Sequence, residues 1–128
     1  MTTGLYQLII RLDEGATIRV GRLGAFRFPR GYYVYTGSAR SGLEQRVARH
    51  LRRDKRLHWH IDYLLARGSV TQVLVYPGAG SECALNRAVE ALPGGEVVVR
   101  GFGSSDCRCR AHLHFFARPP DLSPAAFA

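Results

Sequence analysis

Apolar, β-branched and aromatic residues recur along the chain in short runs that are bounded by Gly and Pro. Such runs are typical of β-strands. Two of them flank the turn Gly21–Gly24 and therefore predict a short hairpin. The ranges expected to be strands are Gly4–Arg11, Thr17–Val20, Ala25–Phe28, Tyr32–Tyr35, Val70–Tyr76, Glu96–Arg100 and Ala111–Ala117.

Other segments place their apolar residues at helical spacing. Leu43, Val47 and Leu51 follow Ser41, which can cap a helix, at i, i+4 and i+8. The expected helices run from Ser41 to about Arg53, from Trp59 to Arg67 and from Ser81 to Leu92. Because strands and helices mix without a βαβ repeat, the predicted fold class is α+β, with a small mixed or antiparallel sheet flanked by helices.

A length of 128 residues suits a single domain. We assign residues 1–118 to this domain and expect residues 119–128, which are rich in Pro and Ala, to form a flexible tail. No apolar run approaches the roughly 18 residues of a membrane span, and the first residues lack the features of a signal peptide. We therefore expect no membrane partner and a cytoplasmic location.

The charge of the chain points to a polyanionic partner. Eighteen Lys and Arg residues against ten Asp and Glu give a net charge of +8, and the bases between Arg40 and Arg56 are offset only by Glu44 and Asp54. One-signed charge of this kind favours phosphate binding over a merely solvated face. We expect DNA as the partner, with RNA not excluded. The basic residues predicted to contact nucleic acid are Arg40, Arg49, Arg52, Arg53, Lys55 and Arg56.

The stretch HWHID holds two further candidates, His58 and His60. On a helix His58 and Asp62 share a face and His60 does not, so the stretch alone is not expected to bind a metal. The two histidines are interpreted as nucleic-acid contacts or as structural hydrogen-bonding groups.

Arg46 and His50 lie one helical turn apart, on the flank of the expected buried face. At such a half-desolvated border a guanidinium could hold a phosphate, and an imidazole could exchange a proton near neutral pH. The alternative is that both side chains merely extend from the helix flank to solvent.

Four features stand in a suggestive order along the chain. Gly4-Leu5-Tyr6 opens the first strand, Tyr35-Thr36-Gly37 closes a later one, a helix with Arg46 follows, and Glu82 begins a later helix. This order resembles the GIY-YIG endonuclease family, whose signature is Gly-Ile-Tyr, Tyr-Ile-Gly, a helical Arg and a distant metal-binding Glu. The stretches RVARHLR, HWHIDYLL and GFGSSDCRC are similar to its small stand-alone Uri-type branch. The resemblance covers Gly4 to about Pro119.

The resemblance implies a metal-dependent endonuclease that hydrolyses DNA, in repair or processing of structured DNA, with a DNA-repair protein as a candidate partner. Tyr6 and Tyr35 match tyrosines that line the active site, and Arg46 matches the arginine that neutralises the transition state. His50 falls where some members carry a proton-transfer residue. Glu82 matches the carboxylate that holds one Mg²⁺ or Mn²⁺. The alternative function is a non-catalytic nucleic-acid-binding module with the same fold.

The sequence departs from the family pattern in two places. The loop between the triplets contains an extra N-terminal hairpin, and no Asn matches the one that many relatives carry near the metal; Ser104, Ser105 and Asp106 stand in that region. The residue that would activate water is also left open between Tyr35 and His50.

The chain has three cysteines, an odd number that does not suit a secreted disulfide framework. Cys83, Cys107, Cys109 and His112 could form a Cys₃His zinc site, although the C-x-C spacing is tighter than usual. The alternative is a set of buried reduced thiols.

Overall fold

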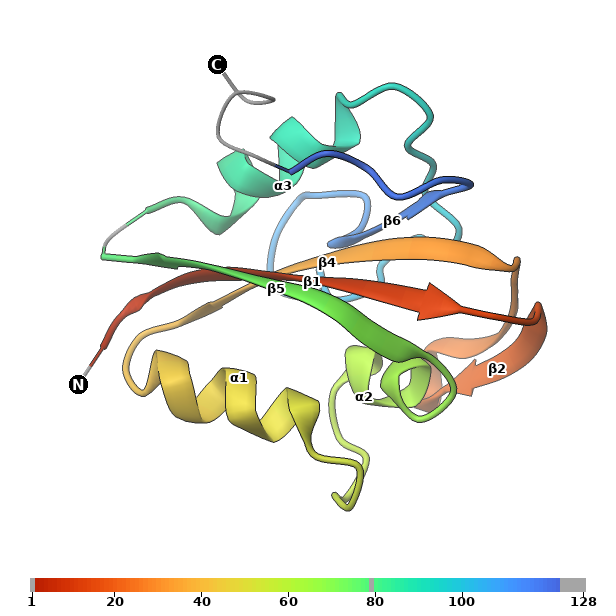
Figure 1. Cartoon of the computed structure of the whole chain (residues 1–128), viewed down its shortest axis with the longest axis horizontal. Helices are drawn as coiled ribbons and strands as arrows, with labels where there is room; N and C mark the ends of the chain where they lie inside the picture. Colours follow the sequence, from red (N-terminus) through yellow and green to blue (C-terminus); the bar gives the residue numbers. More distant parts are fainter. Residues whose placement is uncertain (1, 79, 123–128) are drawn as a thin grey trace.

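A four-stranded antiparallel sheet carries helices on both of its faces in the computed structural model, which describes residues 2–78 and 80–122 (Figure 1). The strand order is β5-β1-β4-β6, and β2 and β3 form a separate hairpin. The strands are β1 (Gly4–Leu12), β2 (Ala16–Val20), β3 (Gly24–Phe28), β4 (Gly31–Ala39), β5 (Ser69–Pro77) and β6 (Leu113–Phe116). The helices are α1 (Leu43–Leu51), α2 (His60–Leu65) and α3 (Glu82–Glu90), and a short 3₁₀ turn (Gly21–Leu23) joins β2 to β3. The predicted α+β class and the extra hairpin are confirmed.

Strand β1 is covered on both faces. Leu8 belongs to the main core together with Leu43 of α1, whereas its neighbour Ile9 packs in a second cluster with Val89 of α3. Figure 1 shows α1 and α2 on one side of the sheet and α3 on the other. Since successive strand residues point to opposite faces, this double cover explains why the strand is apolar almost throughout.

Helix α1 begins and ends differently from the prediction. It follows Gly42, whose φ of 68° is left-handed, rather than a Ser41 cap, and it ends at Leu51. The ammonium group of Lys55 donates to the carbonyls of Arg49 and His50, at 3.2 and 2.6 Å, and so satisfies free carbonyls of the last turn.

The other two helices are shorter than expected. Helix α2 starts at His60 rather than Trp59, because the carboxylate of Asp62 accepts the backbone N–H of Trp59 just before the helix. It ends at Leu65. Helix α3 has the expected Ser81 cap, whose hydroxyl accepts the N–H of Ala84 at 3.1 Å.

The strand expected over Glu96–Arg100 does not form. Only Glu96 pairs, through an isolated bridge to Phe115. Val99 and Phe102 are both buried in the main core, and the N–H of Phe102 bonds the carbonyl of Val99 in a turn. Burying two side chains three residues apart requires a turn here, because a strand would point them to opposite faces.

Part of the expected tail is packed. Leu122 is buried in the second cluster beside Phe116; residues 123–128 lie outside the described residues. Within the described part of the chain, no helix is both long enough and apolar enough to cross a membrane.

Candidate active site

The candidate site lies where β4 extends beyond its neighbour β6. The pairing of these strands ends at Tyr35 and Leu113. A little further along β4, the guanidinium of Arg46 donates to the carbonyl of Ser38 at 2.9 Å, and the hydroxyl of Ser38 donates to the carboxylate of Glu82. Arg46 on α1 and Glu82 on α3, which cover opposite faces of the sheet, thus meet at one residue of an uncovered strand edge.

An open cleft of about 510 Å³ lies at this edge. Four of the residues singled out from the sequence line it together: Tyr6, Tyr35, Arg46 and Glu82. They come from β1, β4, α1 and α3, so the fold brings together groups that are far apart in the sequence.

The two tyrosines pack against each other above a glycine. Their ring centroids are 6.2 Å apart, and strand pairing sets Tyr6 opposite Gly37. A Cβ at Gly37 would lie 2.5 Å from Cζ of Tyr6, so the glycine of the Tyr35-Thr36-Gly37 triplet makes room for the Tyr6 ring. Burial raises the pKa of Tyr6 to about 12, against the opposing effect of Arg46, and it raises the pKa of Tyr35 well above its usual value. Both phenols are therefore protonated hydrogen-bond donors at neutral pH.

Arg46 is held by an indole as well as by Ser38. Its guanidinium carbon lies 4.5 Å from the centroid of the Trp59 ring, and that of Arg49 lies 4.7 Å from the same ring. Cation–π contacts of this kind restrict a long side chain that would otherwise be mobile. Trp59 is a cleft residue that the sequence reading named only as a helix start.

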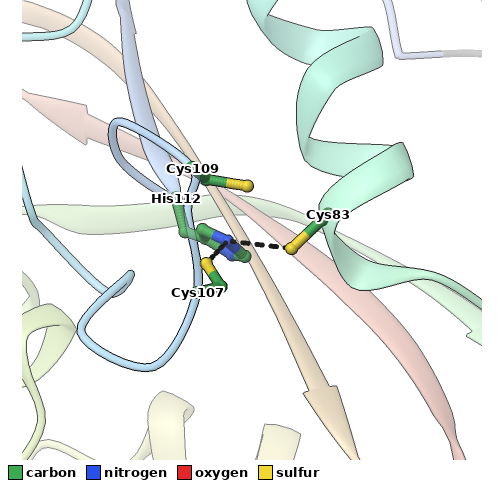
Figure 2. A group of neighbouring side chains, drawn as sticks. All are labelled: Cys83, Cys107, Cys109 and His112. Carbon is green, nitrogen blue, oxygen red and sulfur yellow. Dashed lines mark hydrogen bonds between the residues drawn. The ribbon is translucent and has the colours of Figure 1, made fainter.

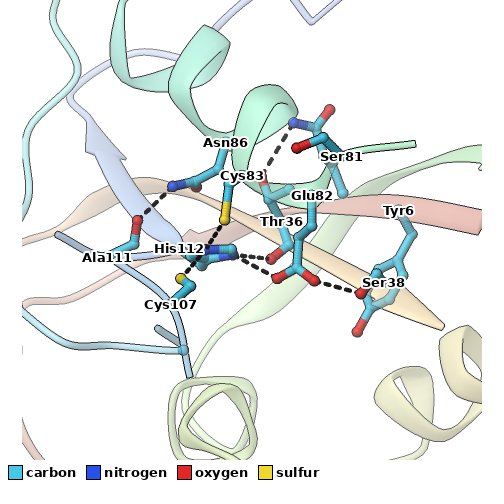
Figure 3. Close-up of polar contacts among 12 residues, drawn as sticks. Tyr6, Thr36, Ser38, Ser81, Glu82, Cys83, Asn86, Cys107, Ala111 and His112 are labelled. Carbon is cyan, nitrogen blue, oxygen red and sulfur yellow. Dashed lines mark hydrogen bonds and ion pairs between the residues drawn. The ribbon is translucent and has the colours of Figure 1, made fainter. Parts of the chain in front are cut away.

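Glu82 makes two hydrogen bonds within the protein (Figure 3). One carboxylate oxygen accepts from Ser38 and the other lies 2.7 Å from Nδ1 of His112. Burial raises the pKa of Glu82, but the hydrogen bonds from His112 and Ser38 outweigh it and leave the pKa below its usual value. An ionised carboxylate has about four acceptor positions. Glu82 therefore retains the capacity to bind a divalent cation, beyond the ordinary role of an acid in the first turn of a helix.

His50 does not reach the cleft. The side chain is buried beneath Tyr6, with Nε2 at 2.7 Å from the phenol oxygen, and it packs against Trp59. Burial lowers the pKa of His50 to about 4, so the imidazole is neutral at pH 7. Arg46 therefore lines the cleft, whereas His50, one turn further along α1, contacts Tyr6 from the inside.

The HWHID stretch divides between the cleft and the core. His58 and His60 line the cleft, and Nδ1 of His60 accepts the backbone N–H of Gly103 at 2.8 Å, which leaves the ring proton of the neutral form on Nε2. Asp62 is fully buried and holds Arg49 in a two-pronged ion pair, with both N–O distances at 3.0 Å. Burial raises the pKa of Asp62, but hydrogen bonds from Arg49 and two backbone N–H groups outweigh it and lower the pKa.

Three of the six basic residues that were predicted to contact nucleic acid bind groups within the protein instead. Arg49 binds Asp62, Arg53 donates to the carbonyls of Leu65 and Gly68, and Lys55 ends α1. The other three have exposed side chains: Arg40, Arg52 and Arg56. Arg53 is exposed as well, but its guanidinium is engaged by those carbonyls, so the second group is the one that offers unengaged guanidinium groups to a phosphate backbone.

The loop before β6 also contributes to the cleft. Gly103, Ser105 and Asp106 line it, together with Ser38 of β4. In the sequence, Ser105 and Asp106 are only residues of the region where many relatives carry an Asn, which they do not match. Their place in the cleft depends on how the loop folds back, which no local pattern encodes.

Next to the cleft, the three cysteines and His112 form one cluster (Figure 2). All three thiols are free, and each is half-buried rather than buried. The four candidate ligand atoms lie within 4.8 Å of one another.

Among known families, the one described as "Domain of unknown function DUF123" matches residues 5–126. Neither a curated protein nor a solved structure matches the chain.

Proposed function

The chain belongs to the DUF123 family, and we propose that it is a metal-dependent endonuclease that hydrolyses phosphodiester bonds in DNA. One observation carries the proposal: a carboxylate, a guanidinium and two phenols converge in a single open cleft. The same four residues carry the resemblance to the GIY-YIG endonucleases. Binding alone would not require a partly buried carboxylate beside a guanidinium and two phenols.

Hydrolysis of a phosphodiester needs relief of the negative charge that develops on the phosphoryl oxygens. Arg46 supplies it. Its guanidinium is fixed by the Ser38 carbonyl and the Trp59 ring, yet it still lines the cleft. A planar guanidinium can bind two phosphoryl oxygens at once, which an ammonium group cannot.

Glu82 is the residue that would hold the metal. Oxygen ligands suit Mg²⁺ or Mn²⁺, and either ion would act as a Lewis acid on the phosphate. The Ser38 hydroxyl and the His112 ring fix the direction of both carboxylate oxygens before any ion binds.

The phenols act as donors in this proposal. Tyr6 and Tyr35 are protonated at neutral pH, so they can orient a phosphate oxygen or the attacking water by hydrogen bonding. His50 holds Tyr6 from behind and is a positioning residue. Neither Tyr35 nor His50 serves as the general base at neutral pH, because the first is not ionised and the second is outside the cleft.

Cleavage of supercoiled plasmid and of branched DNA, with a matched RNA, tests the proposal. We expect cleavage of DNA with Mg²⁺ or Mn²⁺ and none with a chelator. Glu82→Gln should lower the single-turnover rate by about 100-fold or more, since a Lewis acid contributes several kcal/mol. Glu44→Gln, which changes an exposed acid in the first turn of α1, is the matched control. Salt-dependent binding without cleavage under every metal condition would favour the non-catalytic binding module instead.

A further inference from the structure

The cysteine cluster joins helix α3 to the loop that precedes β6. Cys83 lies on α3, Cys107 and Cys109 lie in the loop before β6, and His112 directly precedes that strand. Nε2 of His112 lies 3.2 Å from the sulfur of Cys107 and 4.0 Å from that of Cys83 (Figure 2). We propose that these four side chains bind one Zn²⁺, which fastens the loop to α3 and orients Glu82 through His112.

The donor set and its spacing suit zinc. In a tetrahedral site with Zn–S near 2.3 Å and Zn–N near 2.0 Å, neighbouring donors lie about 3.5 to 3.8 Å apart. The two Cys–His distances of 3.2 and 4.0 Å lie on either side of that range. No two of the four donor atoms are more than 4.8 Å apart, so shifts of about 1 Å bring them to tetrahedral spacing. Thiolates are soft ligands that select zinc over Mg²⁺.

The loop has a physical need for a metal. Phe102 and Ala111 are buried at its two ends, but between them the chain offers no apolar side chain larger than the cysteines. A segment without its own core loses conformational entropy on folding and gains little from burial. Zinc binding supplies that free energy, while the three thiols and Nε2 of the cationic His112 ring release their protons to solvent, so that His112 ligates as the neutral ring.

His112 connects this site to the candidate active site. Its Nε2 faces the sulfurs, and its Nδ1 faces Glu82 at 2.7 Å and the carbonyl of Thr36 at 3.2 Å (Figure 3). Zinc-binding histidines commonly donate their second N–H to a carboxylate, which fixes the ring and the carboxylate together. The role of Glu82 in catalysis rests on the proposed function, whereas the zinc site itself does not.

Metal analysis of the full chain, purified in a reducing buffer without chelator, tests the site. We expect about one zinc per chain, and after replacement by Co²⁺ a thiolate-to-cobalt absorption band with the intense visible bands of a tetrahedral ion. Cys109→Ser should weaken zinc binding by at least about 100-fold, more than the loss of an outer-shell partner. Arg108→Ser, which makes the same new side chain one residue earlier, should bind zinc as the wild type does.

Competition between the wild-type protein and a chromophoric chelator gives the zinc affinity even if the cysteine variant fails to fold. Wild-type protein that takes up neither zinc nor cobalt would overturn the site.

Glu82→Gln should keep one zinc per chain but weaken its binding by about 10- to 100-fold, whereas Ser38→Ala should not weaken zinc binding. Equal affinities for Glu82→Gln and wild type would overturn the link to Glu82. Failure of DNA cleavage with zinc bound would contradict only the nuclease proposal.

Discussion

The phenol of Tyr6 and the imidazole of His50 share a 2.7 Å hydrogen bond on the inner side of the cleft wall. His50 is only 2% exposed, and its Nδ1 has no hydrogen-bond partner among the described residues. The pair makes His50 a support for Tyr6. It also places a titratable group where protonation is costly.

This burial predicts a specific loss of stability in acid. Burial sets the folded-state pKa of His50 at about 4, below the usual histidine value of 6.5. As the pH falls through this window the unfolded chain takes up a proton that the folded chain does not, so stability present above pH 6.5 is lost. A shift of this size corresponds to about 3 kcal/mol at most. His50→Gln should keep a polar contact to Tyr6 and remove up to that amount of the acid loss, measured by chemical denaturation at pH 7 and pH 4.5.

His58→Gln is the control, because His58 is exposed. It should leave the pH dependence of stability as it is in the wild type. If His50→Gln also loses stability in acid as the wild type does, His50 is not the buried neutral group.

Sequence patterns predicted the elements more reliably than the direction of individual side chains. The expected seam of the first helix was Leu43, Val47 and Leu51. In the structure Leu51 is 48% exposed and His50 takes the inner place. Positions i+7 and i+8 of a helix are both near the seam, and the tilt of the helix on the sheet decides between them.

The candidate site was predictable only in part. Tyr6, Tyr35, Arg46 and Glu82 were identified from motif order, and the structure brings them to one cleft. The internal role of Arg49 was not predictable, because its partner Asp62 becomes a neighbour only after the chain turns between α1 and α2. A run of basic residues in the sequence shows how many cations are present. It does not show which of them form ion pairs within the folded protein.

A methyl group at Gly37 should damage the site. The substitution Gly37→Ala would set a Cβ 2.5 Å from the ring of Tyr6. Overpacking of this kind costs about 1 to 3 kcal/mol and displaces the ring. We expect a lower melting temperature, which calorimetry would measure. Gly80→Ala is the control, since its nearest neighbour is the flexible end of Leu5 at 3.1 Å, and a variant of Gly37 as stable as that control would contradict the close packing.

The exposed arginines should carry the salt dependence of DNA binding. Each phosphate contact adds about one unit to the slope of log affinity against log salt. Arg40→Ala, Arg52→Ala and Arg56→Ala should each flatten that slope by about one unit in fluorescence anisotropy titrations. An unchanged slope in all three variants would show that this segment is not the binding surface.

Arg49→Ala should act on stability instead. It would leave the Asp62 carboxylate buried without its ion-pair partner, and such a loss costs about 3 kcal/mol or more. Urea denaturation of this variant against Arg52→Ala, which lacks such a partner in the described structure, would separate the two roles. Equal stabilities would mean that the Arg49–Asp62 pair does not hold α1 to α2.

The geometry of Arg46 should matter beyond its charge. Arg46→Lys keeps the positive charge but loses the planar fork and the contact with Trp59. We expect single-turnover cleavage to fall by about 100- to 1000-fold, the range for loss of one transition-state donor. Arg87→Lys on the exposed side of α3 is the control. A Lys variant that cleaves at the wild-type rate would reduce Arg46 to a simple point charge.

The two phenols should influence cleavage without titrating near neutral pH. Because burial raises the pKa of Tyr6 to about 12 and that of Tyr35 well above 10, Tyr35→Phe removes a donor and not a base. A hydrogen bond to a charged group contributes about 1.5 to 3 kcal/mol, so the rate should fall by about 10- to 100-fold at every pH from 6 to 9. The rate–pH profiles of wild type and variant should therefore run parallel, and a rising limb that disappears in Tyr35→Phe would identify Tyr35 as the base.

The raised pKa values of Tyr6 and Tyr35 also predict that the stability of the protein, complete below pH 10, declines toward pH 12 as the tyrosines of the unfolded chain ionise. Tyr6→Phe should lessen that alkaline loss, because it removes a phenol that is protonated only in the folded state at such pH.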